Sequence, residues 1–246
     1  MKLLVCVSQT PDTTTKIKFS GDNTALDANG VQFIMNPYDE WYALVRAVEL
    51  KEKLGGTVTL FHVGPASNEA TMRKGLAIGA DSAVRVDAEA SSSLFVAKQI
   101  AEHAKSENYD IIFFGKETID YNGSEVPAMV SELLDLPFVS YAMALEMNGA
   151  VATLQRDIEG GKEILEVNTP FVVSAAKGMA EQRIPNMKGI MNSKRIPINV
   201  IAAVAAPEVT KAVKFEYPPE KTGCKYIDPE NMDELVSLLH NEAKVI

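Results

Sequence analysis

Few residues of this chain are suited to covalent or metal chemistry. Its two cysteines, Cys6 and Cys224, lie outside any CxxC or Cys/His cluster, so neither a disulfide framework nor a zinc site is indicated. Its three histidines, His62, His103 and His240, occur without a GxSxG or HExxH motif, and we expect each to be structural or at the surface. The sequence therefore predicts no catalytic residue and no metal site.

The common phosphate-binding motifs are also absent. Neither GxGxxG nor GxxxxGKS/T occurs, which excludes a dinucleotide fingerprint and a Walker loop. The first apolar run, residues 3–7, leads into Ser8-Gln9-Thr10-Pro11, which cannot replace the serine- and glycine-rich loop of an ATP pyrophosphatase. We therefore do not expect adenylate-transfer chemistry.

Long apolar runs and positive charge are scarce as well. No stretch approaches the ~20 apolar residues of a membrane-spanning helix, and the N-terminus lacks the apolar core and the cleavage site of a signal peptide. The net charge of −9 argues against a general affinity for nucleic acid or anionic lipid. We expect a cytoplasmic protein with no nucleic-acid partner and no membrane insertion.

Apolar residues make up 46% of the chain, enough for a large core. Along the first part of the chain, short apolar runs alternate with segments that have helical periodicity. Near-continuous apolar runs at 3–7, 57–63, 83–86 and 110–114 are typical of strands covered on both faces. Segments with helical periodicity lie between and after these runs, at 37–54, about 67–79, 92–106 and from about 124. This order predicts an α/β fold with a doubly wound, mainly parallel sheet.

The helix starts can be placed from capping residues. Asn36 is expected to be the N-cap of the first helix with Pro37 at its first position, and Ser67 is expected to cap the second helix. The helix after residue 114 is expected to begin near Ser124.

The pattern changes after residue 140. Asn148-Gly149 and Gly160-Gly161 separate alternating or β-branched runs, which predicts β-hairpins. Residues 176 to about 227 show no sustained period and are expected to form an extended arm, followed by a helix from Asp228-Pro229. An apolar arm of this length is difficult to bury alone, so we expect a partner subunit to cover it.

A polar loop follows the strand at 110–114 and could hold a phosphate. Gly115 allows close backbone approach, Lys116 adds charge, and Thr118, Asn122 and Ser124 supply donors beside the start of the next helix. An ordinary strand-to-helix loop remains the alternative.

A second segment, residues 182–198, is basic in an acidic protein. It carries Arg183, Lys188, Lys194 and Arg195 with apolar residues among them: Ile184, Met187, Ile190 and Met191. Flexible apolar side chains ringed by cations could anchor an acidic partner, although a solvated loop is the alternative.

Several motifs together resemble the β subunit of electron transfer flavoprotein. They are Asn36-Pro37, Gly64-Pro65, LAIGAD at 76–81, GKETID at 115–120, and the segment Arg156-Asp157-Ile158-Glu159-Gly160-Gly161 with Glu163, Leu165, Pro170 and Val172-Val173-Ser174 after it. They span nearly the whole chain.

The resemblance implies an adenine-nucleotide α-hydrolase-like fold in a heterodimer whose α subunit carries a redox FAD. In such a pair the β subunit holds AMP with no redox role, and is an electron carrier subunit, not an enzyme. Electrons come from dehydrogenases, such as the acyl-CoA dehydrogenases of fatty acid oxidation, and pass to a quinone oxidoreductase. Residues 1–175 would form the AMP-binding domain, and residues 176–246 the recognition loop and an arm packed on the α subunit.

The resemblance also implies site residues. The AMP would contact Cys6, Asn36, Pro37, Tyr38, Asp39, Val63, Gly115, Lys116, Glu117, Thr118, Ile119, Asp120, Tyr121, Asn122, Gly123, Ser124, Glu125 and Val126. Partner contacts would come from Ile184, Met187, Lys188, Ile190, Met191 and Asp157, with Ile184 as the apolar anchor of the recognition loop.

The chain departs from the family pattern in three places. Asp120-Tyr121-Asn122-Gly123 stands where many members have a run of acids, Thr13 replaces an aromatic residue often found near the flavin, and Asp157 replaces a glutamate. A bifurcating form with a second FAD in place of AMP therefore stays open. Two further alternatives are a stand-alone adenine-nucleotide sensor of the universal stress type and a nucleotide-hydrolysing enzyme.

Overall fold

The four apolar runs form neighbouring parallel strands of one sheet in the computed structural model, which describes residues 1–221 and 223–246. The sheet has the order β11-β5-β4-β1-β6-β10-β7-β8-β9. Its strands are β1 (Lys2–Cys6), β4 (Thr57–Val63), β5 (Ser82–Val86), β6 (Ile111–Gly115), β7 (Phe138–Asn148), β8 (Val151–Ile158), β9 (Gly161–Asn168), β10 (Phe171–Ala175) and β11 (Ile198–Ile201).

Both faces of the parallel part of the sheet are covered by helices. Leu3 and Val5 of β1 belong to a core with α1 (Asp39–Leu54) and α2 (Glu69–Ile78), whereas Leu4 of β1 packs against α3 (Ser93–Glu107) and α4 (Val126–Leu134). Successive side chains of a strand point to opposite faces, so strands between two helical layers must be apolar throughout. The predicted doubly wound α/β sheet is confirmed.

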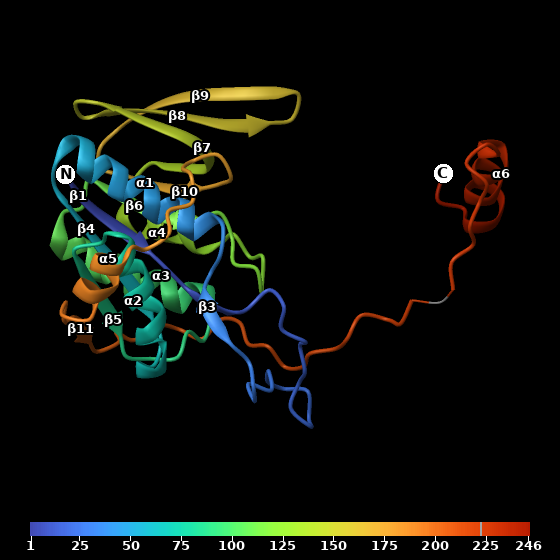
Figure 1. Cartoon of the computed structure of the whole chain (residues 1–246), viewed down its shortest axis with the longest axis horizontal. Helices are drawn as coiled ribbons and strands as arrows, with labels where there is room; N and C mark the ends of the chain where they lie inside the picture. Colours follow the sequence, from blue (N-terminus) through green and yellow to red (C-terminus); the bar gives the residue numbers. More distant parts are fainter. Residues whose placement is uncertain (222) are drawn as a thin grey trace.

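The last three strands of the sheet are antiparallel. β7 pairs with β8 and β8 with β9, and the connecting turns, Gly149-Ala150 and Glu159-Gly160, lie at the expected glycine positions. The φ angles of Gly149 and Gly160 are 62° and 83°, a region that glycine adopts without strain. Figure 1 shows this β7–β9 extension projecting from one edge of the sheet.

Three helices of the main body start slightly later than the expected positions. α1 begins at Asp39 after Tyr38, not at Pro37, because the Asn36 side chain bonds to another loop. Ala66–Asn68 form a short 3-10 turn, η1, so α2 starts at Glu69 without a Ser67 cap. α4 starts at Val126 instead of Ser124.

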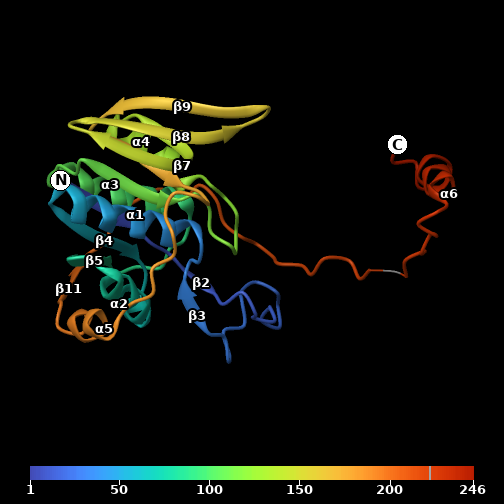
Figure 2. The same cartoon turned by 45° about the horizontal axis from the view of Figure 1, so that its top comes forward.

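A small antiparallel pair was not expected. β2 (Gln9–Pro11) pairs with β3 (Phe33–Met35), and the chain between them makes an excursion outside the main sheet. Figure 2 shows this excursion, in dark blue, beside the start of the C-terminal arm.

Residues 187–201, which we expected in the extended arm, instead return to the body of the fold. α5 (Met187–Ser193) packs on α2, and β11 pairs in parallel with β5, with Ile198 opposite Ala83. Arg73 of α2 donates hydrogen bonds to the backbone oxygens of Ser193 and Ile196. Both elements are short, and they are stabilised by contacts with α2 and β5. Such long-range contacts cannot be predicted from sequence periodicity.

The extended arm therefore begins after β11. Its described residues contain no helix or strand up to α6 (Met232–Ser237), which continues as a π-helical turn, η2 (Leu238–Ala243). This helix begins at Met232, four residues later than expected, and Figures 1 and 2 both show it far from the sheet. Met232 and Val236 are exposed there.

Among the helices of the described residues, none combines the length and apolarity needed to cross a bilayer.

Candidate functional site

A cavity of about 540 Å³ lies at the carboxyl edge of β1, β4 and β6. We call it the sheet-edge cavity. Cys6, Val63 and Gly115, the last residues of these strands, line it together. Parallel strands end at one edge of a sheet, which is where open α/β folds hold their ligands. The remaining lining residues are Val7, Ser8, Gln9, Glu40, Phe61, Ala90, Ser91, Ser92, Ser93, Val96, Ile100, Phe114, Lys116, Glu117, Thr118, Asp120, Tyr121, Gly123, Ser124, Glu125, Val126, Pro127, Thr210, Lys211 and Ala212.

Asn36 holds the loop that follows β6. Its side chain is fully buried, its Nδ2 donates to the Glu117 backbone oxygen at 2.9 Å, and its Oδ1 accepts from the Ile119 N–H at 3.0 Å. The amide thus pairs two backbone groups that would otherwise lack partners in a partly buried place. Asn36 shapes the wall of the cavity without lining it.

Gly115 lies against the first turn of α1. A Cβ at this position would stand 2.7 Å from both the Cγ and the backbone N of Glu40. No side chain fits there without displacing the helix, so the glycine is explained by the close approach of β6 and α1.

Glu40 is a buried acid in the wall of the cavity. Its carboxyl accepts a hydrogen bond from the Ser8 N–H at 2.7 Å and another from the Ser8 hydroxyl, and 5% of the residue is exposed. Burial, opposed by these two bonds, raises the pKa of Glu40 to about 8, and the charges of Asp120 and Asp39 add to the rise. Burial, followed by the charge of Glu40, also raises the pKa of the Cys6 thiol.

His62 is a structural residue. Its Nδ1 donates to the Val7 backbone oxygen at 2.8 Å, and its Nε2 accepts from the side-chain amide of Asn68 at 2.9 Å. Burial lowers the pKa of the imidazole, which keeps the neutral form that this pattern needs. Both ring nitrogens are used within the fold.

The structure brings together twelve of the eighteen residues expected to contact a nucleotide. These line the sheet-edge cavity: Cys6, Val63, Gly115, Lys116, Glu117, Thr118, Asp120, Tyr121, Gly123, Ser124, Glu125 and Val126. The other six do not line it: Asn36, Pro37, Tyr38, Asp39, Ile119 and Asn122. Tyr38 is exposed to solvent, with a positive φ of 65°.

Sequence reasoning missed several lining residues. Glu40 shares the buried face of α1 with Ala43, Leu44 and Ala47, at spacings of three, four and seven, so an acid on that face was a readable signal. Ser91 to Ser93 lie at the start of α3, where the Ser92 hydroxyl accepts from the Phe95 N–H at 3.2 Å. No local pattern pointed to Lys211, which lies in the arm.

In residues 182–198, which we call the basic segment, exposed apolar side chains cluster around α5. Ile184 is 83% exposed and Met187 73%, and Ile190 and Met191 are also exposed. Ile184 and Lys188 line a second hollow of about 630 Å³ between this segment and the end of α2. An exposed apolar group of this kind is a candidate docking surface.

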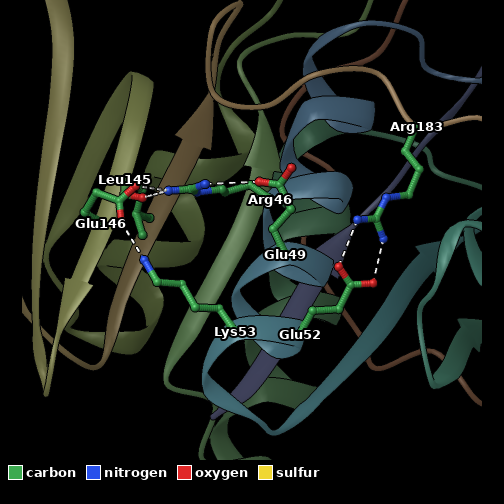
Figure 3. A network of polar contacts seen from close by, with 7 residues as sticks. All are labelled: Arg46, Glu49, Glu52, Lys53, Leu145, Glu146 and Arg183. Atoms are coloured by element: carbon green, nitrogen blue, oxygen red, sulfur yellow. Dashed lines mark hydrogen bonds and ion pairs between the residues drawn. The ribbon is translucent and has the colours of Figure 1, made fainter.

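The base of this segment is attached to α1. The Arg183 guanidinium forms two parallel bonds with the Glu52 carboxylate, at 2.8 and 2.9 Å (Figure 3), and the Arg183 backbone oxygen accepts from Trp41 Nε1 at 3.3 Å. Bidentate arginine–carboxylate pairs fix orientation as well as position. The contacts with Glu52 and Trp41 thus fix the position of Arg183, which directly precedes Ile184.

The other side of α1 is attached to the β7–β9 extension. Arg46 donates to the Leu145 backbone oxygen and pairs with Glu49 and Glu146, at 3.0 and 2.9 Å, while Lys53 pairs with Glu146 at 3.3 Å (Figure 3). α1 therefore links the extension to the basic segment.

Asp157 does not join the other residues expected at a partner contact. It lies exposed in β8, near the β9 edge of the sheet, whereas α5 packs by α2 near the β11 edge. Figure 1 shows β8 and α5 on opposite sides of the body. Asp157 and the basic segment therefore lie on different parts of the surface.

Comparisons with known proteins agree with the fold and with the resemblance. A model described as "Electron transfer flavoprotein domain" matches residues 24–206. The chain is 34% identical over 261 residues to the electron transfer flavoprotein subunit beta of Bacillus subtilis (strain 168), with 100% of each chain covered. It is 40% identical over 233 residues to the protein of the same name from Syntrophomonas wolfei, covering 94% of this chain and 91% of the relative. The Mus musculus subunit is 31% identical over 255 residues, covering 100% and 99%. The chain therefore belongs to the electron transfer flavoprotein family, as a β subunit.

Proposed function

We propose that this chain holds AMP in the sheet-edge cavity and pairs with an α subunit that carries a redox-active FAD. The observation that carries the proposal is the cavity itself, lined by the loop after β6 and by the ends of three parallel strands. The Asn36 bonds give the loop one defined shape.

The cavity suits a small anionic ligand with a flat ring. Phe61, Val63, Val96, Ile100 and Phe114 offer apolar walls on which a base can lie. The loop after β6 and the start of α3 add hydroxyls from Thr118, Ser124, Ser91, Ser92 and Ser93, and two lysines lie at the wall. A nucleoside monophosphate uses both kinds of surface.

The chain acts as a carrier subunit and not as an enzyme. When bound, the FAD of the α subunit supplies the redox chemistry, and this chain supplies a surface that positions it and its electron donors. Met232 and Val236 of α6 are exposed in the part of the chain that the structure describes, which supports a partner subunit that covers this helix. Two free cysteines fit a reducing compartment such as the cytoplasm.

Electrons are proposed to arrive from dehydrogenases, such as the acyl-CoA dehydrogenases of fatty acid oxidation, and to leave to a quinone oxidoreductase. The exposed Ile184 and Met187, held at their base by the Arg183–Glu52 pair, support docking of the dehydrogenase on the basic segment. Asp157 is proposed as a separate contact, to a partner that covers the β7–β9 extension.

A bifurcating form with a second FAD in place of AMP is the second candidate. Tyr121 and Gly123 line the cavity in the loop for which the family resemblance implied a run of acids, and this departure supports the second candidate. The stand-alone sensor and the nucleotide-hydrolysing enzyme lose their support, because the chain belongs to a family of electron carrier subunits.

The test is to express the chain together with an electron transfer flavoprotein α subunit from the same organism and to purify the complex. A yellow complex with a flavin spectrum that releases one AMP and one FAD on denaturation supports the proposal. Release of two FAD molecules favours the bifurcating form. A colourless chain that purifies alone and releases no adenine nucleotide refutes both.

A further inference from the structure

The first part of the C-terminal arm reaches the sheet-edge cavity and forms part of its lining. Thr210, Lys211 and Ala212 line the cavity together with strand ends more than eighty residues away in the sequence. We call residues 204–217 the strap. Figures 1 and 2 show it leaving β11 and passing beside the N-terminal excursion before the arm departs from the body.

The strap is attached at its beginning by Gln99 of α3. This side chain is 3% exposed, its Nε2 donates to the Val204 backbone oxygen at 2.9 Å, and its Oε1 accepts from the Val204 N–H at 2.7 Å. The amide satisfies both backbone groups of one residue, as a strand partner would. Val204 is therefore held against the same helix whose first turn lines the cavity.

The strap is attached at its end by an aromatic cluster. Phe19 stacks on Phe215 with ring centroids 5.2 Å apart and lies 4.9 Å from the ring of Tyr217. The Phe215 N–H donates to the Asn23 backbone oxygen at 2.8 Å, and the Phe19 N–H to the Tyr217 hydroxyl at 3.3 Å. Aromatic pairs of this geometry stabilise a contact beyond the area that they bury.

The charges around the cavity distinguish its two lysines. Lys116 pairs with Glu117 at 2.9 Å, so its charge is already balanced within the loop. Within the part of the chain that the structure describes, Lys211 has no acid at ion-pair distance. Lys214, three residues further along the strap, pairs with Glu216 at 2.7 Å and does not line the cavity.

We propose that the strap closes the cavity over its ligand and that Lys211 supplies the cation that holds the ligand's phosphate. The inference rests on the proposed function, since it needs an anionic ligand in the cavity. An unpaired lysine on a segment fixed at both ends can meet that anion without reordering the chain, and charge-assisted bonds to phosphate are the strong ones. The attachments at Gln99 and Phe19 set how fast the ligand leaves.

The first test compares Lys211→Gln with Lys214→Gln in the purified α–β complex, after its nucleotide has been removed. Binding of AMP and of adenosine is measured by calorimetry at two salt concentrations. We expect Lys211→Gln to weaken AMP binding about tenfold or more and adenosine binding less than about twofold, with a smaller salt dependence for AMP. Lys214→Gln should match the unmodified protein.

The second test addresses the attachment. Tyr217→Ala combined with Phe215→Ala should speed AMP release, whereas Tyr226→Ala, in an exposed part of the arm, should not. Equal AMP affinity of Lys211→Gln and Lys214→Gln, or equal loss of AMP and adenosine, overturns the role of Lys211. An unmodified complex that binds AMP in neither test overturns the proposed function as well, so the two failures can be told apart.

Discussion

The substitution Glu40→Gln should change how the stability of the protein depends on pH. The folded state raises the pKa of Glu40 from 4.5 to about 8. Between these values the unfolded chain has lost the proton while the folded chain retains it, so the free energy of unfolding falls as pH rises. Glutamine keeps the shape, and it can accept from the Ser8 N–H through Oε1 and donate to the Ser8 hydroxyl oxygen through Nε2, but it has no proton to take up.

The magnitude follows from the size of the shift. At about 1.4 kcal/mol for each pKa unit, burying Glu40 costs up to about 5 kcal/mol above pH 8, of which about 3–4 kcal/mol appears between pH 5 and pH 8. The Ser8 N–H and hydroxyl stabilise the ionised form and keep the cost below that of an unpartnered acid. Glu40→Gln should therefore be the more stable protein at pH 8, and the difference should shrink towards pH 5.

The assay is urea unfolding from pH 5 to pH 8.5 at a fixed nucleotide concentration, because a bound ligand adds to apparent stability. Glu132→Gln, an exposed position of α4, controls for the loss of one carboxylate. The reasoning is refuted if the free energies of unfolding of the unmodified protein and of Glu40→Gln change in parallel across this pH range. The Glu40 carboxyl would then titrate alike in the folded and unfolded states.

Three further predictions concern the loop, the strand end and the docking surface. Asn36→Ala should lower the free energy of unfolding by about 1–3 kcal/mol in urea and release AMP, because two loop groups lose their partner, whereas Asn29→Ala in an exposed loop should change neither. Gly115→Ala should cost about 1–3 kcal/mol in the same assay, because its Cβ meets Glu40, while Gly21→Ala, where no atom lies within 4 Å, should be neutral. Ile184→Ala should slow electron transfer from the dehydrogenase in stopped-flow flavin reduction without releasing AMP.

The outcomes that contradict these predictions are specific. AMP content unchanged in Asn36→Ala would show that the loop keeps its shape without the amide. Equal stability of Gly115→Ala and Gly21→Ala would show that β6 and α1 can separate at no cost. Ile164→Ala removes another exposed apolar side chain, from β9 at the other end of the sheet, and serves as control for Ile184→Ala. Equal kinetics of these two variants would refute docking at Ile184.

Local periodicity was enough to predict the regular elements of the central sheet. β1, β4, β5 and β6 are apolar on successive residues because helices cover both faces, and α1 and α3 carry stripes that the sheet buries. Asn148-Gly149 and Gly160-Gly161 likewise marked the turns of β7–β9, because the positive φ of Gly149 and Gly160 is a local requirement. The family resemblance followed from motifs in the same elements.

Residues whose partners are distant in sequence were beyond such reasoning. Asn36 reads as a helix cap by its neighbours, yet its amide is taken by a loop more than eighty residues later. α5 and β11 are short, and their order comes from α2 and β5, to which they pack.

The sequence by itself determined the doubly wound sheet, its antiparallel extension and the loop after β6, because short-range periodicity and turn residues encode them. Only the tertiary structure decided which residues surround the cavity. Glu40 and Lys211 reach it from a helix and from the arm, and burial and closure depend on how these distant segments pack. The pattern of α1 shows that an acid lies on its buried face, but the local pattern of neither segment shows that Glu40 and Lys211 meet at one cavity.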